Sequence, residues 1–385
     1  MDSCNPIRTA HSCATDPQQA ASELHAALSQ PDMALVVFFC SSNYDLDRLA
    51  EELNRLFAGV RVVGCTTAGE IGPAGYRDHS LSGFSFAATA SKAVSGLLPD
   101  LQNFTSTRGQ AFTQGLTQQL EELTAHDHQA NTFAFLMIDG LSIREEPVVH
   151  ALQSALRGIP LCGGSAGDDL KFVRTRVFHD GAFHDDSAVL LLLSTPLPFR
   201  MFKTQHFISD NERLVVTEAD AEHRIVKEIN GLPAADEYAR ILGIKPAELD
   251  AEHFAATPVV VVIDGTDYVR SIQQANPDGS LRFFCAIEEG LILRVARGAD
   301  LLANLVEAFD GIRKELGPPL LTLGCDCILR NQEITQKNLK EKAGAEFMRN
   351  NAVGFSTYGE QYGSVHINQT FTGIAIGSPD WNRNA

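Results

Sequence analysis

Short runs of apolar residues alternate with amphipathic stretches along the first half of the chain. Residues 34–39 and 132–138 are apolar throughout and bounded by polar residues, which is typical of strands buried on both faces. The stretches around these strands repeat apolar residues three and four apart, which predicts helices. The predicted helices cover residues 17–29, 46–56, 110–124 and 146–156.

These elements follow one another in the same order twice. Each copy runs helix, apolar strand, helix, short strand and glycine-rich turn, and the two turns are residues 64–70 and 162–168. A helix–strand unit that recurs in this way predicts an α/β domain with an internal duplication.

From Phe199 onward the pattern changes to shorter segments. Strands are predicted at 200–208, 214–217, 225–229, 259–263, 269–272, 281–286, 320–325, 353–357, 365–371 and 373–376, and helices at 234–242, 300–315 and 338–350. We therefore predict an α/β (α+β) protein of two domains with mixed sheets and a boundary near Leu197. A tail and first helix would cover residues 1–29, the two domains 30–197 and 198–377, and a C-terminal tail 378–385.

Composition narrows the class of protein. The 385 residues carry a formal net charge of −17, which disfavours binding to nucleic acid or to an anionic membrane surface. No apolar run reaches the length of a membrane span, and the start of the chain does not resemble a signal peptide. The eight cysteines are too scattered for a disulfide scaffold. We expect a cytoplasmic protein, and a homo-oligomer is compatible with the sequence.

Several motifs together resemble the FIST family of sensory proteins. Residues 64–71 (GCTTAGEI) resemble its N-terminal domain, and residues 288–294 (EEGLILR), 323–325 (LGC) with Arg330, and 354–360 (GFSTYGE) resemble its C-terminal domain. His366 to Asn368 complete the last motif. The resemblance implies an intracellular sensor of small ligands. One branch of the family, the NosP-type proteins, binds haem, senses nitric oxide and acts on a partner histidine kinase in trans.

Three turns share a pattern of small residue, any residue, glycine and acid. Glycine lets the backbone approach a ligand closely, and a nearby carboxylate can hold an amine or a water molecule. Ordinary strand-to-loop turns would also use these residues. The candidate pairs are Gly69 with Glu70, Gly167 with Asp168, and Gly359 with Glu360.

His206 is the preferred candidate for an iron ligand. Alternation along the predicted strand 200–208 places it on one face with Phe202, Thr204 and Ile208, where an apolar surface could pack against haem b. His366 is the second candidate and shares a polar face with Asn368. A histidine with an ordinary place in the core is the alternative.

The favoured reading is a haem-based nitric oxide sensor. Nitric oxide on the iron would weaken the bond to His206, and the relaxed strand would be read by a partner histidine kinase, because the chain carries no output motif of its own. The ligand pocket would lie where the glycine–acid turns and the His206 strand converge.

Two other functions remain open. In a sensor of an amino acid or another small metabolite, Glu70, Asp168 and Glu360 would bind an amine. A thiol-dependent enzyme using Cys40 or Cys65 is disfavoured, because no base or oxyanion motif accompanies either cysteine. We therefore expect a protein that is not an enzyme.

Overall fold

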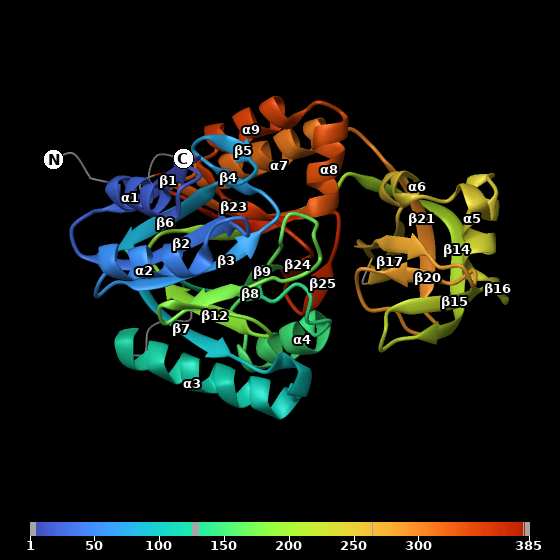
Figure 1. Ribbon diagram of the computed structural model, residues 1–385, viewed down its shortest axis with the longest axis horizontal. Coiled ribbons are helices and arrows are strands. Elements are labelled where there is room, and N and C mark those ends of the chain that lie inside the picture. The colour runs from blue at the N-terminus through green and yellow to red at the C-terminus, as the bar shows by residue number, and fades with distance from the viewer. Residues whose placement is uncertain (1–4, 125–130, 264, 380, 382–385) are drawn as a thin grey trace.

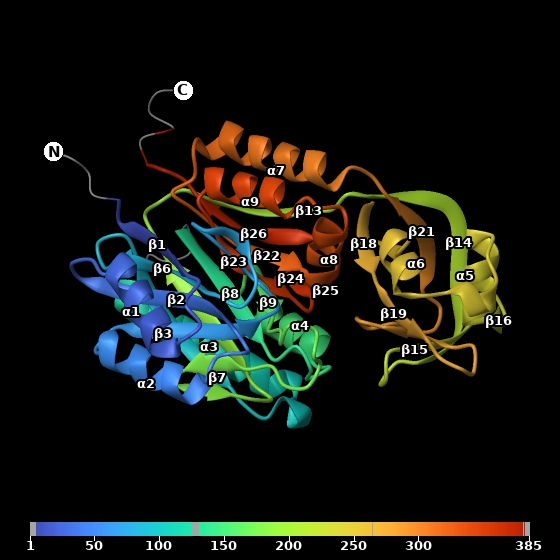
Figure 2. The same cartoon turned by 45° about the horizontal axis from the view of Figure 1, so that its top comes forward.

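The computed structural model describes residues 5–124, 131–263, 265–379 and 381. Figures 1 and 2 show a large body and a smaller lobe beside it. The body is built from the chain up to Thr204 and again from Leu301, and the lobe is the segment between them.

The body contains three copies of one unit in the described part of the chain. The first copy is β1 (Ile7–Ser12), α1 (Pro17–Leu28), β2 (Met33–Ser41), α2 (Leu46–Leu56), β3 (Arg61–Thr67), β4 (Glu70–Gly72), β5 (Gly75–Arg77) and β6 (Leu81–Ala87). Both helices begin as the sequence predicts, because Asp16 and Asp45 accept hydrogen bonds from backbone N–H groups of the first turn.

The second copy repeats this order, and the third repeats it with one extra helix and with the lobe inserted after its first strand. The second is β7 (Lys92–Leu98), α3 (Ser106–Thr124), β8 (Thr132–Ile138), α4 (Glu145–Ala155), β9 (Leu161–Ser165), β10 (Val177–His179), β11 (Ala182–His184) and β12 (Ala188–Ser194). The third is β13 (Phe199–Thr204), α7 (Leu301–Leu316), β22 (Leu321–Cys327), α8 (Ile328–Gln336), α9 (Lys340–Arg349), β23 (Ala352–Thr357), β24 (Glu360–Tyr362), β25 (Val365–Ile367) and β26 (Phe371–Ile376).

Each copy completes the sheet of another copy. In the described residues every copy forms four neighbouring strands of a six-stranded sheet, and a hairpin from a different copy adds the last two. Hairpin β10–β11 pairs with β3, β24–β25 pairs with β9, and β4–β5 pairs with β23. The three hairpins are therefore exchanged in a closed cycle.

Backbone hydrogen bonds tie the three turns before these hairpins together at the centre of the body. The N–H of Ala68 donates to the carbonyl of Ser356 (3.0 Å), and the N–H of Gly167 donates to Thr66 (3.0 Å). The N–H of Tyr358 closes the ring by donating to Ser165 (3.2 Å). The three glycine–acid turns therefore converge, although they lie far apart in the sequence.

One apolar core fills the space between the three sheets. Phe39 from the first copy stacks on Phe355 from the third, with ring centroids 4.6 Å apart, and meets Phe135 from the second edge-on at 6.4 Å. All three rings are buried. Burying apolar surface stabilises a folded protein by about 25 cal/mol per Å². This shared core is therefore a main source of the body's stability.

The lobe is an antiparallel sheet with its own core. Its elements are β14 (Phe207–Asp220), β15 (Ile225–Ile229), β16 (Leu232–Pro233), α5 (Ala234–Leu242), α6 (Ala251–Ala256), β17 (Val259–Ile263), β18 (Thr266–Arg270), β19 (Ile272–Ala275), β20 (Leu281–Phe283) and β21 (Ile292–Gly298). Buried Arg224 joins it to the body through ion pairs with Glu145 (2.7 Å) and Glu146 (2.6 Å).

The α/β class with mixed sheets is confirmed, but the chain divides differently from the prediction. The sheets do not separate near Leu197, because strands after Leu301 pair with strands of the first 200 residues. In the predicted N-terminal tail, residues 1–4 lie outside the described residues and Ile7–Ser12 form β1 against β6. In the predicted C-terminal tail, residues 380 and 382–385 also lie outside the described residues.

Two predicted strands break in the structure. The strand predicted at 200–208 ends at Thr204 in the body, and β14 begins at Phe207 in the lobe. The strand predicted at 365–371 is interrupted after Ile367, because residues 368–370 lead the chain from β25 to β26, which belongs to another sheet. The face alternation inferred across both positions is therefore wrong.

Candidate functional site

The acids of two glycine–acid turns serve the hairpin exchange. Glu70 is fully buried, accepts hydrogen bonds from Ser80 N–H (2.9 Å) and Ser80 Oγ (2.6 Å), and also contacts the hydroxyl of Thr67. Glu360 is equally buried and accepts from the Thr357 hydroxyl (2.6 Å) and from Thr370 N–H (3.2 Å) and Oγ1 (2.6 Å). Each carboxyl ties a turn to the strand that follows its hairpin.

Burial changes the proton affinity of both carboxyls. Loss of water around them raises the pKa of Glu70 to about 8, and that of Glu360 to about 8, although the hydrogen bonds oppose this change. Neither side chain is exposed, so neither can meet a ligand from solvent in this arrangement.

Asp168, the acid of the remaining turn, holds a loop. Its carboxylate accepts three backbone N–H bonds, from residues 172 (2.9 Å), 173 (2.7 Å) and 174 (2.8 Å), and it also contacts the hydroxyl of Tyr358. The loop that it fixes contains Asp169, Leu170 and Phe172 with φ of 57°, 63° and 51°. Left-handed backbone at non-glycine residues is costly and is often found at functional sites.

Two of the turn glycines are required by close packing. A Cβ on Gly167 would lie 2.8 Å from the backbone nitrogen of Ala68. A Cβ on Gly359 would lie 2.2 Å from Cε1 of His366. Gly69 has φ of 133° and lies against the side chains of Asn331 and Asp78. These glycines let the turns pack against each other and against their neighbours.

His206 lies at the neck between body and lobe with both ring nitrogens in polar contact. Nε2 is 2.9 Å from an oxygen of Glu333, and Nδ1 is 3.2 Å from Nη1 of Arg330. The side chain is fully buried, and burial lowers the pKa of the imidazole. The carbonyl of His206 accepts a hydrogen bond from Ala299 N–H (2.7 Å), where the chain returns to the body.

The residues predicted to share a face with His206 point elsewhere. Phe202 packs on Phe371 in the body with ring centroids 5.1 Å apart, and Thr204 donates to Asn304 Oδ1 (2.7 Å). Ile208 belongs to the lobe and is 69% exposed. The strand break at 205–206 separates these side chains, so they do not form one apolar surface.

His366 and Asn368 are buried beside the turn of Gly359. Nδ1 of His366 lies 3.2 Å from Nε2 of Gln361, while Nε2 of His366 and Oδ1 of Asn368 have no hydrogen-bond partner among the described residues. Burial lowers the pKa of His366 to about 4, helped by the nearby charges of Arg224 and Arg270.

Neither histidine fits an axial haem ligand in this structure. Both nitrogens of His206 already contact a charged side chain, and the ring faces Arg330 and Glu333 rather than an apolar slot. The backbone of Gly359 lies against the Cε1–Nε2 edge of His366, which leaves no room for a porphyrin there. In the described residues, no group of three or more His, Cys, Asp or Glu side chains is placed to hold a metal ion.

The cysteines considered for covalent chemistry are also enclosed. Cys40 and Cys65 are fully buried, and burial raises the pKa of both thiols well above the usual value. The neutral thiol, which is a poor nucleophile, is therefore the stable form at neutral pH.

A cleft of about 320 Å³ opens where the three copies meet. The first copy contributes Asp78 and His79, the second contributes Asp169, and the third contributes Asn331 and Lys340. Ala68, Leu170, Ile328, Gln332, Thr335 and Gln336 complete the lining. This volume suits a small organic molecule.

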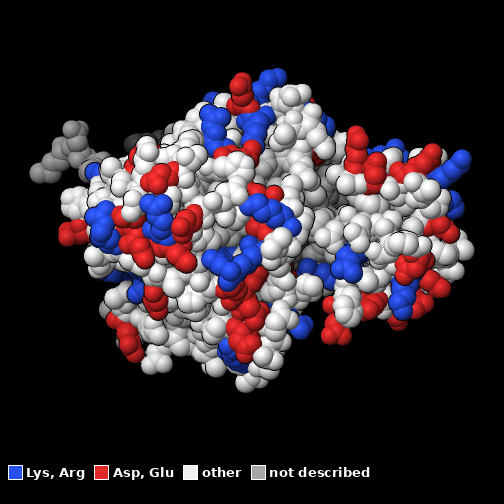
Figure 3. Space-filling model, viewed as in Figure 1, with Lys and Arg blue, Asp and Glu red and all other residues white. Residues whose placement is uncertain are grey.

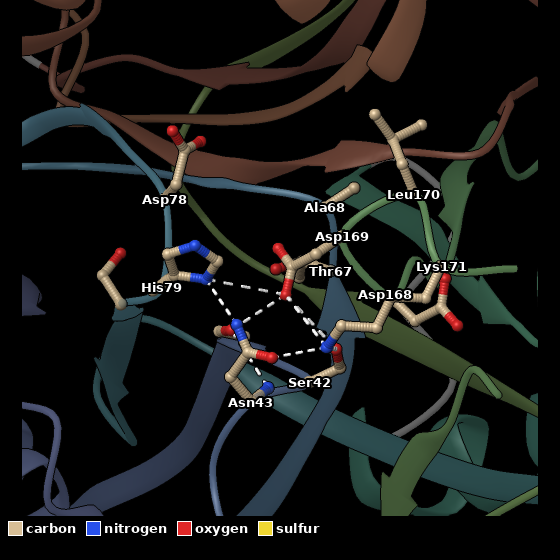
Figure 4. A network of polar contacts seen from close by, with 12 residues as sticks. Ser42, Asn43, Thr67, Ala68, Asp78, His79, Asp168, Asp169, Leu170 and Lys171 are labelled. Carbon is tan, nitrogen blue, oxygen red and sulfur yellow. Dashed lines mark hydrogen bonds and ion pairs between the residues drawn. The ribbon is translucent and has the colours of Figure 1, made fainter. Parts of the chain in front are cut away.

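Asp169 organises the polar side of this cleft, as Figure 4 shows. Its Oδ2 accepts hydrogen bonds from Ser41 (3.1 Å) and Ser42 (3.3 Å) and lies 3.7 Å from His79 Nδ1 and 3.9 Å from Lys171 Nζ. All these contacts use the same oxygen, and Figure 4 shows the second oxygen turned away from them.

Asn331 on α8 supplies a second acceptor. The side chain is 5% exposed, its Nδ2 donates to the carbonyl of Ala68 (3.3 Å), and its Oδ1 has no hydrogen-bond partner among the described residues. Lys340, also in the lining, pairs with Asp78 and lies over the ring of Tyr76.

Sequence reasoning found the turns beside the cleft but missed the residues that line it. It placed no helix at Ile328–Gln336, which carries Asn331, and gave no role to Asp169 or to Asp78 and His79. The sequence did contain a signal for Asp169 as a site residue, because it directly follows a glycine–acid turn.

A body of repeated α/β units around a small cleft, with an inserted lobe, defines a ligand-binding domain. Two family models match the chain, the FIST N domain over residues 34–232 and the FIST C domain over residues 234–363. The chain belongs to the FIST family, whose domains sense small ligands in signalling. No curated protein matches the chain. No helix in the described residues has the length and apolar character needed to cross a membrane.

Glu360→Gln tests the buried turn acids. Between pH 4.5 and 8 the unfolded chain loses the Glu360 proton while the folded protein keeps it. The free energy of unfolding therefore falls as pH rises, by at most about 1.4 kcal/mol per pH unit for this group. The neutral glutamine should flatten the pH dependence of the unfolding free energy, measured by denaturant titration at pH 5, 6, 7 and 8. The exposed Glu51→Gln serves as control. An unchanged slope in Glu360→Gln would contradict the raised pKa.

Absorption spectra test the histidines. When the protein is expressed with haem supplied, we expect His206→Gln, which keeps hydrogen-bonding capacity at the neck, to give the same spectrum as the unmodified protein. Ferrous samples should be compared with and without nitric oxide. A Soret band that is present in the unmodified protein and lost in His206→Gln would show that His206 binds iron after a rearrangement.

Proposed function

We propose that this protein is a sensor of a small amino-acid-like ligand bound in the cleft between the three copies. The observation that carries the proposal is the buried Oδ1 of Asn331, which lacks a donor among the described residues in a cleft that also contains a carboxylate, Asp169. A buried acceptor without a partner costs free energy, which a donor on a bound ligand would recover.

The charges of the cleft favour a ligand with an amine. Oδ1 of Asn331 and the second oxygen of Asp169 are both acceptors, and an ammonium group has three donors to offer them. Lys340 can exchange part of its contact with Asp78 for a ligand carboxylate. These groups together suit a zwitterion, which agrees with the metabolite alternative from the sequence.

The acid proposed to bind the amine differs from those predicted from the sequence. Glu70 and Glu360 are enclosed in hydrogen bonds of the hairpins, and Asp168 is bound to its loop, so the neighbouring Asp169 takes the role. The charged surroundings of His206 do not favour a haem-based response to nitric oxide.

Helix α8 offers a route from the cleft to the lobe. Asn331 and Thr335 on this helix line the cleft, while Arg330 and Glu333 on the same helix hold His206 at the neck. A ligand that shifts α8 would alter the contacts of His206 and bias the position of the lobe. The protein would then pass this state to a partner, for which the family resemblance suggests a histidine kinase.

No catalytic role is proposed. The buried thiols of Cys40 and Cys65 have raised pKa values, which disfavours the nucleophile that a thiol-dependent enzyme needs.

A panel of the twenty L-amino acids, screened by thermal shift and followed by calorimetry, tests the proposal. Each amino acid that binds is compared with its 2-hydroxy acid, which lacks the amine, and we expect the hydroxy acid to bind at least about tenfold more weakly. Asp169→Asn, which keeps shape and tolerates φ of 57°, should weaken binding of the amino acid by a similar factor.

The exposed Asn211→Ala in the lobe is the matched control and should bind as the unmodified protein does. The proposal is wrong if no amino acid binds at millimolar concentration, if the hydroxy acid binds equally well, or if Asp169→Asn has no effect.

A further inference from the structure

A second, smaller cavity lies between the body and the lobe. Its volume is about 140 Å³. The body contributes Gly140, Leu141, Ile143, Glu145, Phe172 and Tyr358, and the lobe contributes His223, Arg224, Gln273, Arg282, Phe283 and Phe284. It is distinct from the central cleft, with which it shares no lining residue. A pocket between two parts of a protein is a common place for a ligand.

Arg282 on β20 lacks a carboxylate partner at this cavity. Its Nε is buried and has no hydrogen-bond partner, and no ion pair involves Arg282 within the described residues. The other arginine of the lining, Arg224, is held between Glu145 and Glu146. A guanidinium whose Nε is buried without a partner favours an anion, because carboxylates match its donors.

The junction as a whole carries more arginine than acid. Arg270 is also buried here and donates to the carbonyl of His366 (2.6 Å). Arg224, Arg270 and Arg282 therefore outnumber the two acids, Glu145 and Glu146. Burial raises the pKa of Glu145, although the charge of Arg224 opposes the effect. In Figure 3 basic side chains lie along the seam between lobe and body. This excess of positive charge stands out in a chain whose net charge is −17.

Aromatic rings also line the cavity. Phe172 stacks on Tyr358 with ring centroids 4.8 Å apart and an angle of 25°, and it lies 6.4 Å from Phe284 of the lobe. Phe172 is 41% exposed and is held in left-handed backbone by the loop that Asp168 fixes. An exposed ring held in this way offers a face for stacking.

We propose that this junction cavity binds a small monocyclic aromatic carboxylate, with the carboxylate on Arg282 and the ring against Phe172 and Tyr358. A cavity of about 150 Å³ is known to hold a benzene ring, so this one accepts one ring and little more. The ligand would touch both body and lobe and therefore stabilise their contact. The site does not depend on the function proposed for the central cleft.

Calorimetric titration of the full chain with benzoate tests the site. We expect saturable binding of benzoate, and binding at least about tenfold weaker for benzyl alcohol, which keeps the ring without the charge, and for sulfate, which keeps the charge without the ring. Arg282→Gln should weaken benzoate by about tenfold or more. Arg213→Gln, an exposed arginine of the same lobe, should leave it unchanged.

Two further variants locate the binding. Phe172→Leu keeps an apolar side chain and removes the stacking face, so benzoate should bind several-fold more weakly. Asn331→Ala in the central cleft should leave benzoate binding intact, and amino-acid binding should survive Arg282→Gln.

The inference is overturned if benzoate does not bind at tens of millimolar, if Arg282→Gln binds it as the unmodified protein does, or if benzyl alcohol or sulfate matches it. Loss of benzoate binding in Asn331→Ala with retention in Arg282→Gln would assign the ligand to the central cleft instead.

Discussion

The exchange of hairpins among the three copies is the constraint on which the rest of the body depends. Each six-stranded sheet is completed by β-strands from another copy, so no copy can satisfy the backbone hydrogen bonds of its own sheet edge. The turns before the hairpins must then meet at the centre, where a ring of backbone bonds joins residues 66–68, 165–167 and 356–358. The turn glycines and buried acids are consequences of this convergence.

Differences between the copies, rather than their likeness, create the cleft. In the first and third copies the turn acid, Glu70 or Glu360, is the first residue of a hairpin strand. In the second copy Asp168 instead holds the loop of residues 169–174, whose Asp169 faces the cleft. The third copy places α8 directly after β22, which brings Asn331 to the same point.

The sequence predicted local elements well and long-range pairing poorly. Apolar strands and capped helices follow from residue patterns, and so does the α/β class. β1 was missed because it alternates irregularly between polar and apolar residues at a sheet edge, and α8 because it begins without a turn signal after Cys327. The turn at Thr357–Glu360 repeats those of the first two copies, yet the inserted lobe separates β13 from α7 and hides the third copy. The predicted strand face of His206 was wrong because the chain passes from one sheet to another at this point. Tertiary contacts, which a local residue pattern does not encode, decide where that happens.

Three features near the boundary of lobe and body lie beside the two cavities. His206 meets α8, whose neighbouring residues line the central cleft. Arg224 meets the start of α4 beside the junction cavity. The loop held by Asp168 contributes Leu170 to the cleft and Phe172 to the junction cavity, two residues apart on strained backbone. Strain passes between sites through contiguous segments that are tightly packed or fixed by hydrogen bonds. A loop fixed by three backbone hydrogen bonds to one carboxylate is such a segment, so the two cavities share a physical connection that does not pass through the neck.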